Sequence, residues 1–190
     1  MATNNEIEFK QLLSQSQYQS IYNKYFPEMQ PFSQTNYYID TEQFDLRSHK
    51  SALRIRVKDD YYEMTLKVPA EVGLMEYNFE THVIPELNKE LVANDLPLEI
   101  TEQLNKMMLT LISCDSWCFD YFTFKKEVQG NLLVLDKSDY LNYQDYELEY
   151  EVEDYDDGLI QFKMILEAFD IKHETPENKV SKIFSIVNQI

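Results

Sequence analysis

The sequence predicts an α+β protein: about eight strands that form an antiparallel sheet or barrel, with helices packed on the apolar faces of the strands. Two observations lead to this fold class. Strand-like segments, mostly joined as hairpins, alternate along the chain with inserted amphipathic helices. Six of these segments also carry ionisable side chains at every second position, so each would have one charged face and one apolar face. The helices must pack on the apolar faces, and in a closed sheet the charged faces would point inward.

The first half of the chain supplies most of the expected strands. A strand over 5–11 is followed by a helix that begins after Ser14, a suitable N-cap, and ends at Pro27. The pair Asp59-Asp60 is typical of a hairpin tip. Further strands are expected over 35–41, 52–60, 61–68 and 74–81, and helices over 85–95 and 98–104.

A second block of strands and helices completes the chain. Strands are expected over 118–128, 132–140 and 145–154. A helix with an apolar stripe begins near Gly158, and another amphipathic helix follows Pro176. Because no long linker or low-complexity segment interrupts the pattern, residues 1–190 are expected to form a single domain.

Composition excludes several classes of function. The net charge of −17 argues against a nucleic-acid partner and against an anionic membrane surface, although a polyanion could still be held in a pocket with local positive charge. Two cysteines make neither a disulfide framework nor a zinc site. No basic region followed by an apolar run stands at the start, and no apolar stretch approaches membrane-spanning length. We therefore expect a cytoplasmic protein with no membrane partner.

The charged faces are the informative feature. NEIEFKQLL, near the start, places Glu6, Glu8 and Lys10 on one face and Ile7 and Phe9 on the other. The same alternation places these sets on single faces of later strands: Arg54, Arg56 and Lys58; Glu63, Thr65 and Lys67; Glu76, Asn78 and Glu80; Tyr121, Thr123 and Lys125; Glu147, Glu149 and Glu151. A single strand of this kind is usually an ordinary amphipathic strand with its polar face in water.

Six such strands together favour a binding tunnel. A barrel filled with both acidic and basic groups would be too costly as a stability device, because each unpaired buried charge costs several kcal/mol. It suits a ligand that is both anionic and associated with a metal. Arginine and lysine would bind phosphate oxygens, and carboxylates would bind Mg²⁺ or Mn²⁺, which prefer oxygen ligands.

The ordered motifs resemble the CYTH superfamily, the triphosphate tunnel metalloenzymes. EIEFK at 6–10 is similar to the family's E-x-E-x-K motif. The motifs that follow it in the family's order are LRIR at 53–56, TLK at 65–67, an acidic strand around Glu76, a T-x-basic strand at 123–125, VLD at 134–136 and ELE at 147–149. The resemblance covers nearly the whole chain and is closest to the small Firmicute-type branch.

The resemblance implies an α+β fold: an eight-stranded antiparallel β-barrel that forms a tunnel, with helices packed on its outside. It also implies roles for individual residues. Glu6, Glu8, Glu147 and Glu149 would bind or orient a metal ion, and we add Glu76, on the tunnel wall, to this set. Phosphate oxygens would be held by Lys10, Arg54, Arg56, Lys67 and Lys125, and Asp136, also on the wall, joins the substrate-binding set. Within these sets, Glu6, Glu8, Lys10 and Arg56 are the expected catalytic residues.

Three positions depart from the family pattern. Arginine is frequent at the position assigned to Lys125, and the adjacent Lys126 leaves the register open; Lys125 is preferred because it shares a face with Thr123. Asn78 stands where a second carboxylate is frequent, which could weaken a second metal site. Lys179, in ENKVSK at 177–182, could cover the tunnel mouth or be a solvated helix lysine.

The expected function is hydrolysis of a triphosphate, inorganic or organic, with Mg²⁺ or Mn²⁺ as cofactor. The expected partner is thus a small-molecule triphosphate or nucleotide, and the sequence predicts no oligomeric state. Alternatives in the same tunnel are adenylyl cyclase-type cyclisation and thiamine triphosphatase activity. An alternative of another class is a non-catalytic sensor that binds polyphosphate or a nucleotide. The chain has no glycine-rich phosphate loop of the Walker type.

Overall fold

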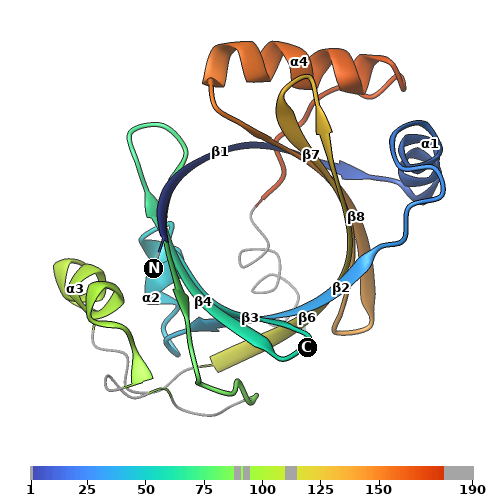
Figure 1. Ribbon diagram of the computed structural model, residues 1–190. Helices are drawn as coiled ribbons and strands as arrows, with labels where there is room; N and C mark the ends of the chain where they lie inside the picture. Colours follow the sequence, from blue (N-terminus) through green and yellow to red (C-terminus); the bar gives the residue numbers. More distant parts are fainter. Residues whose placement is uncertain (1, 88–90, 92–94, 110–114, 178–190) are drawn as a thin grey trace. The chain divides into compact units, whose positions relative to one another are not determined.

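The eight strands close into an antiparallel barrel. The computed structural model describes residues 2–87, 91, 95–109 and 115–177. The strands follow one another around the barrel in the order β1-β5-β4-β3-β2-β6-β7-β8, and the helices of the described residues lie outside the ring of strands (Figure 1). The predicted fold class is therefore confirmed.

The bounds of the elements are close to those expected from the sequence. The strands are β1 (Ala2–Leu13), β2 (Phe32–Asp40), β3 (Ala52–Lys58), β4 (Tyr61–Pro69), β5 (Leu74–Glu80), β6 (Asp115–Val128), β7 (Asn131–Tyr140) and β8 (Tyr143–Val152). The helices are α1 (Gln15–Tyr25), α2 (Asp45–Ser48), α3 (Leu98–Lys106) and α4 (Tyr155–Glu167). The first strand extends further at both ends than the alternation over 5–11 predicted.

Local sequence explains where α1 begins and ends. The backbone N–H of Gln17 donates to Ser14 Oγ at 3.3 Å, and Ser14 N–H donates to Gln17 Oε1 at 2.8 Å. This reciprocal capping box satisfies two donors that have no partner within the helix. Phe26 is the C-cap, and Pro27 follows it with no N–H to continue the helical ladder. The predicted helix is confirmed at both ends.

Tight turns join β3 to β4 and β6 to β7. Gln129 and Gly130 connect β6 to β7, and their φ angles are +55° and +81°. A two-residue hairpin turn of this kind needs positive φ at both positions, because its twist then matches that of the strands. Asp59, with a φ angle of +52°, lies in the turn that connects β3 to β4. The turn predicted at Asp59-Asp60 is confirmed.

The contacts within the chain define two compact units, which are described separately. Unit 1 comprises residues 1–5, 35–119 and 178–190, and unit 2 comprises residues 6–34 and 120–177. Both units contain hairpins and helices, and the boundaries fall within β1, β2 and β6. The single domain expected over residues 1–190 stays a prediction.

The core of unit 1 lies between its strands and the helices α2 and α3. Leu53 and Ile55 from β3 and Met64 and Leu66 from β4 are fully buried. They pack in one cluster that also includes Leu46 of α2 and Ile100 and Leu104 of α3. The register places Leu53 opposite Leu66 and Ile55 opposite Met64, so the apolar positions of the two strands share one face.

The core of unit 2 is built in the same way with α1 and α4. Phe9, Leu133, Leu148 and Tyr150 supply the buried strand positions. The helices contribute Ile21 from α1 and Phe162, Ile165 and Leu166 from α4 to the same cluster. Phe9 lies opposite Tyr150, and Tyr150 lies opposite Leu133, so the apolar faces of β1, β8 and β7 coincide. The side chains between these positions must therefore point the other way.

One predicted helix differs from the structure. Over 85–95, the described residues 85–87 and 91 are not helical and Asp95 is in a 3₁₀ turn, whereas 88–90 and 92–94 lie outside the described residues. Residues 81–86, after β5, have no regular structure, and Val83 N–H donates to Thr81 Oγ1 at 3.2 Å. Val83 and Leu91 pack against the core of unit 1, so hydrophobic burial rather than helical periodicity determines these apolar positions. The helix expected after Pro176 and Lys179 itself lie outside the described residues.

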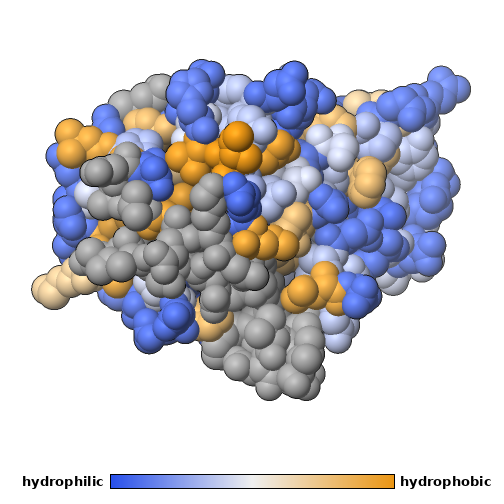
Figure 2. All heavy atoms as spheres, turned by 90° about the horizontal axis from the view of Figure 1, so that it is seen from below, coloured by the Kyte–Doolittle hydropathy of each residue, from blue (hydrophilic) through white to orange (hydrophobic). Residues whose placement is uncertain are grey.

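The surface agrees with the acidic composition. On the face seen in Figure 2, hydrophobic residues form patches among hydrophilic ones. Exposed large apolar side chains include Leu98 and Met108 in unit 1 and Ile160 and Met164 on α4. Within the part of the chain that the structure describes, no helix has the length and apolarity needed to cross a membrane.

Candidate functional site

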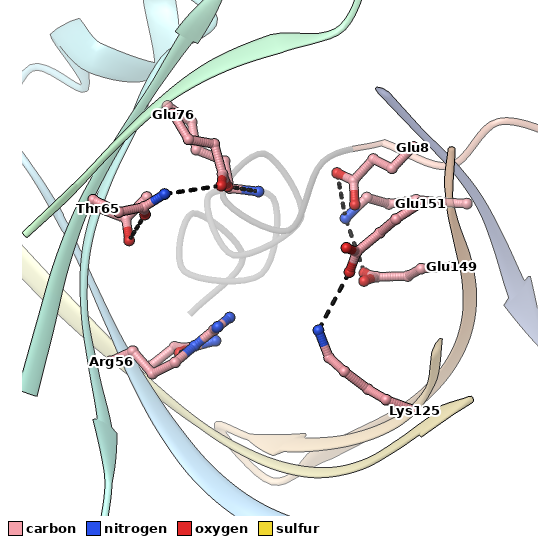
Figure 3. A network of polar contacts seen from close by, with 11 residues as sticks. Glu8, Arg56, Thr65, Glu76, Lys125, Glu149 and Glu151 are labelled. Atoms are coloured by element: carbon pink, nitrogen blue, oxygen red, sulfur yellow. Dashed lines mark hydrogen bonds and ion pairs between the residues drawn. The ribbon is translucent and has the colours of Figure 1, made fainter. Parts of the chain in front are cut away.

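Each unit has a charged strand face opposite its hydrophobic core. We call this face the inner face, and Figure 3 shows its side chains as sticks. In unit 1 it carries Arg54 and Lys67, which alternate with buried leucines. In unit 2 it carries Glu8, Lys10 and Glu149, which alternate with Phe9, Leu148 and Tyr150. The strict alternation of a strand places all of these ionisable groups away from the helices.

In unit 2, Lys10 lies between two carboxylates. Its Nζ is 2.9 Å from Glu8 Oε1 and 2.9 Å from Glu149 Oε1. Lys10 and Glu149 are directly opposite each other in the β1–β8 register, while Glu8 is two positions away on the same strand and face. The side chains of Glu8 and Glu149 are 11% and 13% exposed, against 32% for Lys10. The two carboxylates are therefore buried more deeply than the ammonium that joins them.

The acidic surroundings determine the charge state of Lys10. Burial by itself lowers the pKa of this amine, but the charges of Glu149, Glu8 and Glu147 together with the Glu149 hydrogen bond outweigh burial. The net effect raises the pKa of Lys10 well above its ordinary value. Lys10 is thus a permanent cation in this cluster.

A second row of unit 2 joins Thr123, Asp136 and Glu147. The register places these residues side by side across β6, β7 and β8. Thr123 Oγ1 donates to Asp136 Oδ1 at 2.6 Å, and all three residues are buried. Because this hydroxyl occupies one oxygen of Asp136, the bond fixes the orientation of the carboxylate.

The register at Lys125 and Lys126 is resolved by their contacts. Lys125 Nζ is 3.3 Å from Glu151 Oε1, and the two side chains are 37% and 31% exposed. Lys126 points to the other side of β6, where its Nζ donates to the carbonyl oxygen of Tyr25 at 2.9 Å. The preference for Lys125 on the inner face therefore agrees with the structure.

In unit 1, a short relay of side chains holds Glu76. Lys67 Nζ is 2.7 Å from Glu76 Oε1, and Asn78 Nδ2 donates to Glu76 Oε2 at 3.2 Å. Thr65 Oγ1 in turn donates to Asn78 Oδ1 at 2.7 Å. Thr65 thus orients the Asn78 amide, and the amide donates to Glu76. An ionised carboxylate at position 78 could not donate this hydrogen bond.

This relay lowers the pKa of Glu76. Burial tends to raise the pKa of this carboxyl, but the charge and hydrogen bond of Lys67, the amide of Asn78 and the charge of Arg54 outweigh that tendency. The resulting pKa is about 2, against an ordinary value of 4.5. Glu76 is therefore ionised at neutral pH and is held mainly by Lys67.

The two arginines of the LRIR motif lie on β3 of unit 1. Arg56 Nε donates to Asn36 Oδ1 at 3.1 Å, and Asn36 is directly opposite Arg56 in the β2–β3 register. Arg54 lies between Tyr38 on β2 and Thr65 on β4. Sequence reasoning missed Asn36, which orients Arg56. Its signal was an asparagine within a strand, since asparagine is rare there unless its amide has a partner.

The predicted site residues thus fall into two clusters. Unit 2 contains Glu6, Glu8, Lys10, Lys125, Asp136, Glu147 and Glu149, and unit 1 contains Arg54, Arg56, Lys67 and Glu76. Glu6 shares the inner face with Glu8 by alternation. Glu76, a member of the predicted metal-binding set, contacts Lys67 and Asn78, and its metal-binding role stays a prediction.

The donor chemistry of unit 2 fits a hard divalent ion. The carboxylates on its inner face include the six of Glu6, Glu8, Asp136, Glu147, Glu149 and Glu151, and the same face carries the ammonium groups of Lys10 and Lys125. Carboxylate oxygens are the ligands that Mg²⁺ and Mn²⁺ prefer. Among the described residues, no group of three or more acidic, histidine or cysteine side chains is already arranged around one point as metal ligands require. Glu8 and Glu149 converge instead on the Lys10 ammonium.

Comparison with known proteins identifies the family. The CYTH domain matches residues 4–184, which is nearly the whole chain. The chain belongs to the CYTH family. Among curated relatives, the Bacillus subtilis protein named "Putative triphosphatase YjbK" is 33% identical over 186 residues, covering 94% of each chain.

Solved structures of CYTH-like proteins share the fold. A Bacillus halodurans structure described as "a putative adenylate cyclase" is 26% identical, with a TM-score of 0.83, and the match covers 97% of this chain and 100% of that one. A Hippeastrum protein is 24% identical with a TM-score of 0.69, covering 95% of both chains. These likenesses agree with the closed barrel described above.

Proposed function

We propose that this CYTH protein hydrolyses a small-molecule triphosphate inside its barrel, with a divalent metal ion as cofactor. The observation that carries the proposal is the composition of the inner faces, where partly buried carboxylates and cations replace a hydrophobic interior. Such a concentration of charge is costly unless a ligand uses it. The 33% identity to the Bacillus subtilis protein that bears the name of a triphosphatase supports the same reaction.

The carboxylates of unit 2 are assigned to metal binding. Glu8, Glu147 and Glu149 in unit 2, together with Glu6, would hold Mg²⁺ or Mn²⁺. A divalent ion bound there supplies charge neutralisation to phosphate oxygens and lowers the pKa of bound water. This assignment rests on the six carboxylates, whose combined charge the two lysines of the same face do not balance.

The cations would bind and orient the phosphates. The side chains proposed to bind the negatively charged oxygens of a triphosphate are Arg54, Arg56 and Lys67 in unit 1 and Lys10 and Lys125 in unit 2. Asn36 accepts a hydrogen bond from Arg56 Nε and so orients the planar guanidinium, a group whose geometry matches phosphate oxygens. Phosphoryl transfer depends chiefly on such positioning and charge stabilisation, and it needs no covalent intermediate with the protein.

Phosphate release from inorganic triphosphate tests the proposal. The assay compares Mg²⁺, Mn²⁺ and EDTA for the wild type, the double variant Glu8→Gln/Glu149→Gln and the control Glu167→Gln, whose side chain is exposed on α4. We expect metal-dependent release that the double variant loses and the control keeps. Release that is equal in EDTA, or that survives in the double variant, would contradict the assigned metal site.

A second candidate function is cyclisation of ATP. It is favoured by the name of the Bacillus halodurans structure, which is 26% identical to this chain. ATP and thiamine triphosphate are therefore assayed in parallel with inorganic triphosphate, and the ATP products are examined for a cyclic nucleotide. Cyclic product would move the assignment to a cyclase. Tight metal-dependent binding without turnover of any of the three would indicate a sensor.

A further inference from the structure

The position of Lys10 has a consequence for metal binding. Its Nζ is 2.9 Å from one oxygen of Glu8 and 2.9 Å from one oxygen of Glu149. Both carboxylates are more buried than Lys10, and both belong to the set expected to hold the metal. The lysine of the E-x-E-x-K motif thus forms ion pairs with the carboxylates that a divalent ion would use.

An ammonium and a divalent ion would compete for these oxygens. Mg²⁺ lies about 2.1 Å from its oxygen ligands, so an ion bound to Glu8 Oε1 or Glu149 Oε1 would lie within a few ångströms of Nζ. At such a separation in a partly buried site, the repulsion between the two cations is large. Because the side chain of Lys10 is long and 32% exposed, it is the component that can move.

We propose that Lys10 is a displaceable counter-ion: a divalent ion that binds Glu8 and Glu149 expels the Lys10 ammonium, which then becomes available to a phosphate oxygen. Metal and triphosphate therefore bind with positive cooperativity. The metal takes the two carboxylates from Lys10 and so makes Lys10 available to phosphate. A phosphate that binds Lys10 in turn makes the two carboxylates available to the metal. Coupling of this kind is reciprocal, so triphosphate must raise metal affinity by the same factor. The coupling rests on the proposed function, whereas the competition between Lys10 and the metal requires only that the ion binds.

Two other lysines of unit 2 are placed differently. Lys125 Nζ is 3.3 Å from Glu151 Oε1, and both side chains are about one-third exposed. Lys137 lies on the opposite face of β7, where its Nζ is 3.5 Å from Asp139 and 5.3 Å from the centre of the Phe122 ring. Lys137 therefore provides a matched control for the loss of one positive charge from the same unit.

Direct metal binding tests the inference without any turnover. Mn²⁺ affinity of the full chain is measured by electron paramagnetic resonance of the free ion for the wild type, Lys10→Met and Lys137→Met, with and without triphosphate. We expect Lys10→Met to bind Mn²⁺ about tenfold more tightly than the wild type, which is the loss of one competing charge-assisted contact. Lys137→Met should stay within about twofold of the wild type. Triphosphate should raise Mn²⁺ affinity in the wild type and the control but much less in Lys10→Met.

A second measurement separates displacement from simple charge repulsion. The side-chain ammonium of Lys10 is followed in the wild type by ¹⁵N-resolved nuclear magnetic resonance and assigned with Lys10→Met. Its protons should be protected from exchange by the two ion pairs, and Mg²⁺ should abolish that protection. A signal that persists at saturating Mg²⁺ would overturn the inference, as would Lys10→Met binding Mn²⁺ no more tightly than the wild type.

These outcomes are distinct from failure of the proposed function. If the wild type binds Mn²⁺ and hydrolyses triphosphate while Lys10 keeps its ion pairs, only the displacement of Lys10 is refuted. If Mg²⁺ displaces Lys10 but no triphosphate is hydrolysed, the competition holds and the hydrolase assignment fails. If the wild type binds no divalent ion, both are refuted.

Discussion

Removing the carboxylate of Glu76 should make the stability of the protein less dependent on pH. The pKa of Glu76 is about 2 in the folded protein, against 4.5 for an ordinary glutamate. A carboxyl whose pKa is lowered by folding contributes stability above its unfolded pKa, and that contribution is lost as the pH falls toward the folded pKa. The shift of about 2.5 units corresponds to roughly 3 kcal/mol in full. Proton-binding linkage between these two values gives a loss of about 1 kcal/mol by about pH 3.5.

The assay is urea unfolding followed by far-ultraviolet circular dichroism at about pH 6.5 and about pH 3.5. The difference in unfolding free energy between the wild type and Glu76→Gln should shrink by about 1 kcal/mol over this interval. Glu71→Gln, an exposed position in the turn after β4, is the matched control and should follow the wild type at both pH values. Equal m-values check that all variants unfold in the same way. A difference between the wild type and Glu76→Gln that does not change with pH would refute the reasoning about Lys67 and Asn78.

Three further predictions concern packing, capping and recognition. Gly158→Ala should lower the free energy of unfolding by about 1–3 kcal/mol, although this change normally stabilises a helix, because the added Cβ would lie 2.6–2.8 Å from the side chain of Val152; urea unfolding checks it, and an unchanged or higher midpoint would contradict the close contact. Ser14→Ala should cost about 1 kcal/mol by the same assay, since the capping box with Gln17 is lost, and an unchanged midpoint would contradict the role of the cap. Arg56→Lys should raise the KM for triphosphate about tenfold, because lysine replaces a planar fork by a point charge, and steady-state kinetics showing an unchanged KM would remove Arg56 from the substrate contacts.

The sequence predicted which residues lie on the inner faces, but it did not predict all of the contacts between them. Alternation identified Arg54, Arg56 and Lys67 as residues on one side of their strands, because the period of a strand is a local property. It did not identify Asn36 as the residue that orients Arg56. The two are opposite each other only in the register of β2 with β3, which depends on long-range pairing.

The sequence by itself determined the fold class, the family motifs and the division of each strand into an apolar and a charged face. These follow from local periodicity and from the requirement that apolar faces be buried. Only the tertiary structure decided which charges meet. Lys10 and Glu149 are 139 residues apart in the chain, yet strand pairing places Lys10 Nζ 2.9 Å from Glu149 Oε1. Because ion pairs and hydrogen bonds act over a few ångströms, the same residues could serve as a metal site, a phosphate site or both, and the pairing of the strands determines which contacts they make.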